Sequence, residues 1–96
     1  MKKQKGYLVF DIGTGNARVA VVSVTGSVLT VEREDIEYST ETLYPDSRYF
    51  SPQVLWKQVM NLAKRALSRS CDIDIIGLTS TSQRQGIVLI YQNGNP

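Results

Sequence analysis

Short apolar runs separated by turn residues dominate the first third of the chain. The run 7–10 stops at Asp11 and predicts a buried strand. The valine-rich stretch 17–24 predicts a second strand, and residues 28–34 predict a third. Residues 25–27 between them are Thr, Gly and Ser, so the second and third strands should form a hairpin. The first three strands are therefore expected to form an antiparallel meander with no helix between them.

The third predicted strand alternates between apolar and acidic side chains. Leu29 and Val31 fall on one face, and Glu32 and Glu34 fall on the other. This alternation predicts that the glutamates form a solvated face.

A helix is predicted after an irregular stretch. Residues 35–49 have no clear period and predict an extended, looping segment. Ser51 is a suitable N-cap, and Pro52 stands where the first helical turn tolerates proline. The helix should end near Ser70. Apolar residues at the helical period form one stripe, which consists of Leu55, Val59, Leu62 and Ala66. Three further apolar residues lie beside it: Trp56, Ala63 and Leu67. We expect Trp56 to pack in a core or a groove.

Two further strands are predicted after the helix. Residues 73–78 predict a fourth strand, buried on both faces and parallel to the first, and residues 87–91 predict a fifth. Residues 92–95 are turn residues, and the sequence stops at Pro96 directly after them. Because a turn normally leads into another element, we expect the chain to be a piece of a longer protein.

Composition narrows the classes of chemistry. A chain of 96 residues, 42% of them hydrophobic, suits one small domain with little room for a complete two-substrate site. The chain has no histidine, and its single cysteine is Cys71, so zinc sites, Ser/His or Cys/His nucleophiles and an internal disulfide are excluded from it.

Charge and hydropathy indicate neither a nucleic-acid partner nor a membrane. The net charge is +2, and part of the excess comes from lysines at the N-terminal end, which we interpret as a solvated, frayed end. No segment approaches the roughly 20 apolar residues of a membrane span, and no signal peptide is evident. We therefore expect a cytoplasmic protein.

The stretch 11–18 has the composition of a phosphate-binding loop. Glycines allow backbone N–H groups to approach an anion, and neighbouring polar side chains add donors. The residues that would bind phosphate are Gly13, Thr14, Gly15, Asn16 and Arg18. Asp11, at the end of a buried strand, would hold magnesium through water. The alternative is a tight hairpin whose glycines serve only the turn.

Two better-known nucleotide loops do not match this stretch. A P-loop requires a Gly-Lys pair, and the chain contains none. The dinucleotide fingerprint requires a third glycine where Arg18 stands, and it is followed by a helix, whereas a strand is predicted here.

A second polar cluster follows the fourth predicted strand. Gln83, Arg84 and Gln85 would place several donors and acceptors at one strand end, as recognition of a polyol requires. The alternative is an exposed polar loop.

Both stretches resemble motifs of one family. Residues 11–18 resemble the first phosphate motif of the ribonuclease H-like, actin-like ATPase superfamily. They are especially similar to its version in the FGGY carbohydrate kinases, where an arginine lies four residues after the threonine. Residues 76–96 resemble a second FGGY motif, in which a buried strand precedes a glutamine-centred tetrad, an apolar strand and a Gly-x-Pro turn.

The resemblance implies a fold and an activity. The fold would be α/β of the ribonuclease H-like kind, partial, with residues 1–96 forming the N-terminal part of the first lobe and the second lobe absent. The whole protein would transfer the γ-phosphoryl group of ATP to a sugar or polyol hydroxyl, with Mg²⁺ at Asp11. Its catalytic base would lie downstream, so this chain by itself should be inactive.

The resemblance also bears on the substrate. Arg84 and Gln85 match positions that contact substrate hydroxyls in glycerol-kinase-like members. Gln85 stands where those members have an acid, which weakens the case for glycerol. The Ser-x-Arg-x-Gly-Ile-Val pattern is similar to kinases of autoinducer-2.

Two other functions remain open. One is a piece of an actin-like ATPase or scaffold, against which the polar tetrad 83–86 argues. The other is a small non-catalytic interaction module. An edge strand exposed in this chain would also allow pairing with a second copy, so a homodimer is an expectation.

Overall fold

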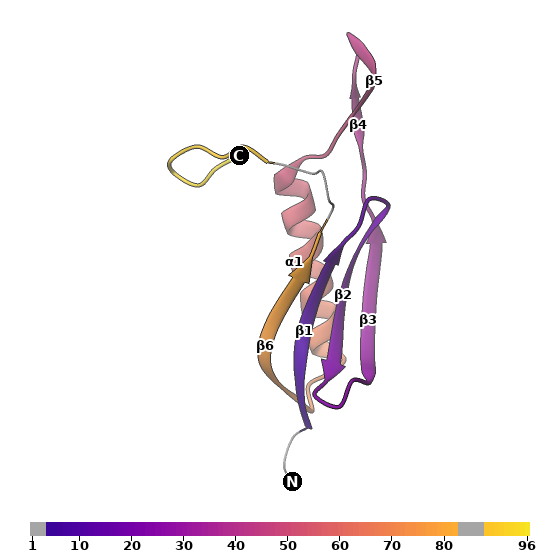
Figure 1. Ribbon diagram of the computed structural model, residues 1–96, viewed down its shortest axis with the longest axis vertical. Coiled ribbons are helices and arrows are strands. Elements are labelled where there is room, and N and C mark those ends of the chain that lie inside the picture. Colours follow the sequence, from indigo (N-terminus) through magenta and orange to yellow (C-terminus); the bar gives the residue numbers. More distant parts are fainter. Residues whose placement is uncertain (1–3, 83–87) are drawn as a thin grey trace.

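A four-stranded mixed sheet forms the centre of the molecule (Figure 1). The computed structural model describes residues 4–82 and 88–96. Its first three strands are β1 (Gln4–Ile12), β2 (Asn16–Ser23) and β3 (Val28–Asp35), and they pair as an antiparallel meander. β6 (Ile73–Thr81) lies on the other side of β1 and runs parallel to it, giving the order β3-β2-β1-β6. The meander and the parallel fourth strand of the sequence prediction are confirmed.

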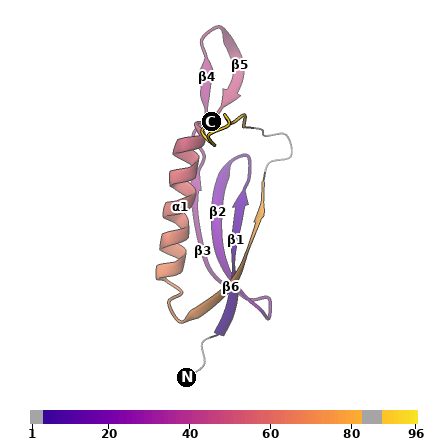
Figure 2. The same cartoon turned by 90° about the vertical axis from the view of Figure 1, so that its left-hand side faces the viewer.

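One helix, α1 (Pro52–Ser68), covers one face of this sheet (Figure 2). The Ser51 hydroxyl accepts a hydrogen bond from the Val54 N–H at 3.4 Å, and Pro52 begins the first turn. At the other end the Arg69 N–H donates to the Arg65 carbonyl at 3.2 Å. Both predicted ends of the helix are therefore confirmed to within two residues.

The core lies between α1 and the middle of the sheet. Alternate residues of β2 point toward the helix because side chains alternate along a strand. They meet residues spaced three and four apart on α1. The buried set comprises Ala17, Val19, Val21, Val59, Leu62, Ala63 and Ala66, together with Leu8 and Ile36. The buried face of α1 is narrower than the predicted stripe, because Leu67 and Trp56 are 39% and 66% exposed.

The prediction of a solvated glutamate face on β3 is wrong. Glu32 pairs directly with Val19, so both side chains point to the same face, and Val19 is fully buried beneath α1. The Glu32 side chain is accordingly only 13% exposed. Leu29 and Val31 point to the opposite face and are 38% and 46% exposed.

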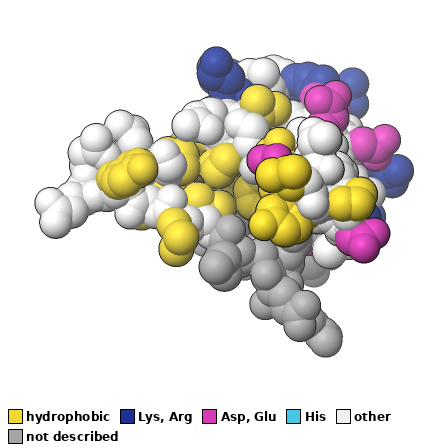
Figure 3. Space-filling model, turned by 90° about the horizontal axis from the view of Figure 1, so that it is seen from above, with side chains coloured by type: hydrophobic (Ala, Val, Ile, Leu, Met, Phe, Trp, Pro, Cys, Tyr) yellow, Lys and Arg dark blue, Asp and Glu magenta, His cyan; other side chains and the backbone are white. Residues whose placement is uncertain are grey.

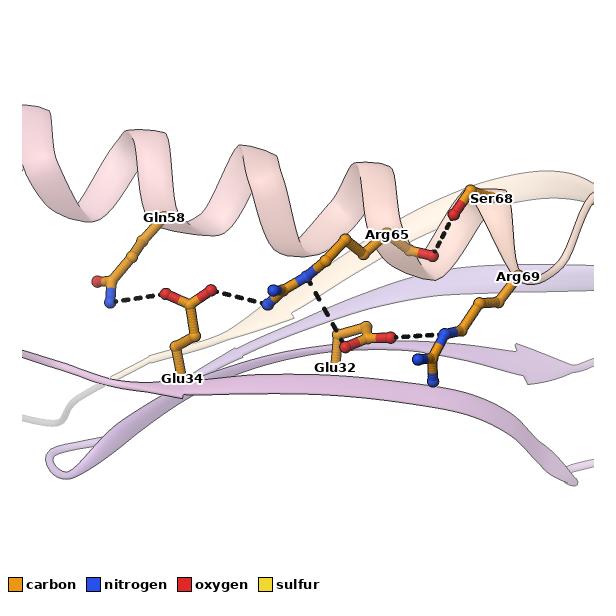
Figure 4. Close-up of polar contacts among 6 residues, drawn as sticks. All are labelled: Glu32, Glu34, Gln58, Arg65, Ser68 and Arg69. Atoms are coloured by element: carbon orange, nitrogen blue, oxygen red, sulfur yellow. Dashed lines mark hydrogen bonds and ion pairs between the residues drawn. The ribbon is translucent and has the colours of Figure 1, made fainter.

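Arg65 of α1 and Arg69, the residue directly after the helix, neutralise these glutamates (Figure 4). Arg69 Nε lies 3.1 Å from Glu32 Oε1, and Arg65 Nε lies 3.8 Å from Glu32 Oε2. Arg65 Nη2 also donates to Glu34 at 2.7 Å, and Gln58 Nε2 donates to Glu34 at 3.3 Å. The helix thus packs against the charged face of β3 and forms ion pairs and hydrogen bonds with its glutamates.

Residues 35–49 are more ordered than the sequence predicted. They contain β4 (Ser39–Glu41) and β5 (Tyr44–Tyr49), which pair antiparallel in a sheet of their own and project beyond the main sheet (Figure 1). The Ser47 hydroxyl joins the strands by accepting from the Glu41 N–H at 2.9 Å and donating to the Tyr44 carbonyl at 2.7 Å. Three exposed residues in β4 are too few to show an alternating pattern.

Two predictions about the later strands are wrong. β6 is not buried on both faces: Ile76 and Leu78 are 48% and 68% exposed, because β6 is an outer strand and the main contacts of α1 are with β2 and β3. Residues 88–91 form no strand, and Leu89 is 84% exposed. A strand needs a neighbour for its backbone groups, and the described residues provide none here. Residue 87 of that prediction lies outside the described residues.

The turn at residues 92–95 is confirmed. The Tyr91 N–H donates to the Asn95 carbonyl at 2.7 Å, and Gly94 has a φ of +86°. With residues 88–96 and the β4–β5 hairpin extended, the molecule measures 59 × 29 × 22 Å. Within the described ranges, no helix is long and apolar enough to cross a membrane.

Candidate functional site

The candidate site lies where β1 and β6 end. The two strands are parallel, so their carboxyl ends meet at the same edge of the sheet, and Asp11 pairs with Thr81. The loop that leads from β1 into β2 starts at this edge. The predicted polyol-binding residues Gln83, Arg84 and Gln85 follow β6 in the sequence but lie outside the described residues. Their placement stays a prediction.

The predicted phosphate loop is a tight hairpin. The Gly13 N–H donates to the Asn16 carbonyl at 3.0 Å, and Asp11 pairs with Arg18 across the strands. Neither Gly13 nor Gly15 has a positive φ. A Cβ atom added to Gly15 would meet no atom of the described residues within 4 Å, its two chain neighbours aside. The turn itself therefore gives no reason for glycine at 15, whereas close approach of a ligand to the backbone does.

Asp11 and Arg18 present opposite charges on one face of the sheet. Asp11 Oδ2 lies 3.7 Å from Arg18 Nη1, and the side chains are 42% and 46% exposed. No group of three or more His, Cys, Asp or Glu residues placed to hold a metal ion occurs among the described residues. A single accessible carboxylate fits Mg²⁺, which keeps several waters and takes its other ligands from phosphate. Arg18 beside it suits a phosphate oxygen.

The segment 36–38, which follows β3, donates two hydrogen bonds to the loop. The Tyr38 hydroxyl donates to the Thr14 carbonyl at 2.6 Å, and the Ile36 N–H donates to the Gly15 carbonyl at 3.0 Å. The Arg48 guanidinium lies 4.5 Å from the centre of the Tyr38 ring. Sequence analysis missed Tyr38, because it stands in a stretch without periodicity and 24 residues from its partner.

An apolar groove of about 510 Å³ lies beside this edge, between α1 and the strands β1 and β6. It is lined by Phe10, Ile12, Phe50, Pro52, Leu55, Trp56, Val59, Met60, Leu78, Ser80, Ser82 and Val88. Figure 3 shows hydrophobic side chains gathered on the face seen from above. Trp56 therefore lines a groove, one of the two placements that the sequence predicted, and is not part of the core.

These features define a mixed α/β domain of one helix and one main sheet, with a polar hairpin loop at the sheet edge. Residues 6–96 match the family model described as the FGGY family of carbohydrate kinases, N-terminal domain. The chain therefore belongs to the FGGY family of carbohydrate kinases.

Individual relatives agree with this membership. The chain is 99% identical, over its whole length, to the "Putative sugar kinase YoaC" of Bacillus subtilis (strain 168). It is 32% identical to the xylulose kinase of Staphylococcus xylosus over 90% of the chain, and 28% identical to the autoinducer-2 kinase of Enterobacter sp. (strain 638) over 92%. The chain spans 20% of the length of the first relative and 17% of the other two.

Proposed function

We propose that this chain is the N-terminal part of the first lobe of an ATP-dependent carbohydrate kinase with a ribonuclease H-like fold. The whole protein transfers the γ-phosphoryl group of ATP to a hydroxyl of a sugar or polyol. The observation that carries this proposal is the exposed hairpin loop, open at Gly15, between the opposite charges of Asp11 and Arg18. Family membership supplies the substrate class.

Each residue of the loop has a role in this proposal. Asp11 holds Mg²⁺ through water, and the ion neutralises charge on the phosphates. The phosphate groups are bound by Gly13, Thr14, Gly15, Asn16 and Arg18. Because the Gly13 N–H already donates to Asn16, Gly13 contributes by shaping the turn, and the N–H groups further along the loop face the phosphate.

The sugar side of the proposed site begins where β6 ends. Gln83, Arg84 and Gln85 bind the substrate hydroxyls, next to the γ-phosphate held at the end of β1. Relatives named xylulose kinase and autoinducer-2 kinase favour a substrate such as xylulose or autoinducer-2 over glycerol. A kinase of this kind, supplied with ATP, works in the cytoplasm.

The apolar groove belongs to the same proposal. In the longer protein, residues beyond this chain cover the groove and complete the core of the first lobe. The catalytic base and the adenosine pocket also lie beyond residue 96. We therefore expect this chain alone to show no sugar-dependent ATP turnover.

The test uses the full-length Bacillus subtilis relative and a panel of sugars, polyols and autoinducer-2, with ADP release as the measurement. ATP turnover should require a sugar. Asp11→Asn should lower kcat/KM for Mg-ATP by at least about tenfold, because the hydrated magnesium ion loses the carboxylate charge that holds it. Asp46→Asn is the matched control, since residue 46 is exposed in β5 and has no ion pair among the described residues.

Three results would contradict parts of the proposal. Equal activity of the Asp11→Asn and Asp46→Asn variants would remove Asp11 from the site. ATP turnover that is independent of any sugar would favour the actin-like ATPase alternative. Turnover by the chain alone would contradict the expectation that it is inactive.

A further inference from the structure

We propose that Tyr38 is a positioning residue for the phosphate loop: its hydroxyl turns the loop so that consecutive backbone N–H groups face ATP. This inference rests on the proposed function, because it concerns the same loop and the same nucleotide. It adds a residue outside the motif, contributed by the segment between β3 and β4.

The evidence begins with two neighbouring carbonyl groups. The Thr14 carbonyl accepts from the Tyr38 hydroxyl at 2.6 Å, and the Gly15 carbonyl accepts from the Ile36 N–H at 3.0 Å. Both oxygens are therefore turned toward the segment 36–38. In a regular strand, successive carbonyls point to opposite sides, so this shared direction is a special feature of the loop.

The direction of the carbonyls determines the direction of the N–H groups. All peptide bonds of the described residues are trans. In a planar trans peptide the N–H points opposite to the C=O. The Gly15 N–H belongs to the same peptide unit as the Thr14 carbonyl, and the Asn16 N–H to the same unit as the Gly15 carbonyl. Both N–H groups are therefore directed away from the segment 36–38, side by side, as an anion-binding loop requires.

Tyr38 is itself held in place. Its ring is partly buried, and the Arg48 guanidinium of β5 lies 4.5 Å from its centre in a cation–π contact. The β4–β5 hairpin thereby supports the aromatic ring whose hydroxyl reaches the loop. Thr14 and Gly15 are exposed, and apart from the neighbours of Gly15 in the chain, no atom of the described residues lies within 4 Å of a Cβ built there. With so little packing, the loop depends on these hydrogen bonds for its order.

The test is Tyr38→Phe in the full-length Bacillus subtilis relative, which removes the donor and keeps the ring and its contact with Arg48. The KM for Mg-ATP should rise about three- to tenfold, as expected for the loss of one hydrogen bond. The kcat and the KM for the sugar should stay within about twofold, because the loop binds phosphate in the ground and transition states alike. The Kd for Mg-ATP without sugar, measured by calorimetry, should rise by the same factor.

The matched control is Tyr44→Phe. Tyr44 lies in β5, as Arg48 does, and is 68% exposed, and its hydroxyl makes no hydrogen bond within the described part of the chain. This variant should leave both KM values and the Kd unchanged. Arg48→Leu should raise the KM for Mg-ATP in the same direction as Tyr38→Phe, because it releases the ring.

The outcomes separate this inference from the proposed function. An unchanged KM and Kd for Mg-ATP in Tyr38→Phe would overturn the role of Tyr38 and leave the kinase proposal standing. An equal rise in the KM of the sugar would also overturn it, because that pattern indicates a general disturbance of the fold. A parent protein that does not bind Mg-ATP would overturn both.

Discussion

Glycine stands at two turns of this chain for different physical reasons: backbone conformation at one and, in our proposal, space for a ligand at the other. Gly26, between β2 and β3, has a φ of +96°, a conformation in which an L-residue with a Cβ is strained. Gly15, between β1 and β2, has no positive φ and open space where a Cβ would stand. The first glycine serves the fold. In our proposal, the second serves a ligand.

This difference predicts opposite effects of one substitution at the two turns. Gly26→Ala should lower the free energy of unfolding of this chain by about 1 kcal/mol, because alanine is strained at positive φ. Gly15→Ala should leave it unchanged or raise it slightly, since alanine restricts the unfolded chain. Urea denaturation followed by circular dichroism measures both. A larger loss for Gly15→Ala than for Gly26→Ala would show that the loop needs glycine for its own conformation.

At the scale of elements, the contact between α1 and β3 combines an apolar core with an ionic border. Glu32 lies opposite fully buried Val19 and under the helix, where an unpaired charge would be costly. Its Oε1 atom is buried and has no hydrogen bond of good geometry among the described residues, although Arg69 Nε lies 3.1 Å away. The charge of Glu32 is thus balanced mainly by ion pairing with Arg65 and Arg69.

The ionic border predicts which glutamate matters for stability. Glu32→Gln should lower the free energy of unfolding by about 1–3 kcal/mol, because it leaves the two arginines without their least exposed partner. Glu41→Gln, the same change at an exposed position without an ion pair among the described residues, should cost less than about 0.5 kcal/mol. Denaturant titrations of both variants provide the comparison. Equal costs would mean that the helix is held by apolar packing alone.

The effect of salt distinguishes the two glutamates of β3. The Arg65 and Glu34 side chains are 50% and 38% exposed, so their ion pair is well screened by solvent and contributes little. Glu32 is more shielded, and its interaction should persist at high ionic strength. The cost of Glu32→Gln should therefore fall only partly when sodium chloride is added.

At the scale of the whole molecule, the sheet is covered on one side by one helix. The main contacts of α1 are with β2 and β3, and the apolar groove remains open between α1 and the strands β1 and β6. The radius of gyration is 15.9 Å, compared with about 13 Å for a compact domain of about 100 residues. This open shape supports our proposal that further residues cover the groove in the longer protein.

The groove yields a comparison between the chain and its full-length relative. Leu78 lines the groove and is 68% exposed here, so Leu78→Gln should cost this chain less than about 1 kcal/mol. If the groove becomes part of a core, the same change should cost the full-length protein more than about 2 kcal/mol, because a buried amide without partners is costly. Thermal unfolding of both proteins measures the difference. Equal costs would show that the groove stays open to solvent.

Local signals made much of this fold predictable. The meander, the capped helix and the parallel strand β6 follow from turn residues, a serine–proline helix start and runs of apolar residues, which act within a few residues of the chain. The motif at residues 11–18 likewise indicated the loop at the sheet edge and the family that the comparison confirms. The part of the site that the sequence missed is Tyr38, whose partner Thr14 is 24 residues away.

The sequence by itself determined the order of the main elements, the helix ends and family membership, because these depend on local conformational preferences and on a motif of adjacent residues. Only the tertiary structure decided which face of β3 is buried, since that depends on the register with β2 and on where α1 lies. It also decided that residues 39–49 pair as a hairpin and that residues 88–91 do not form a strand, because a strand exists only where another backbone supplies its hydrogen bonds.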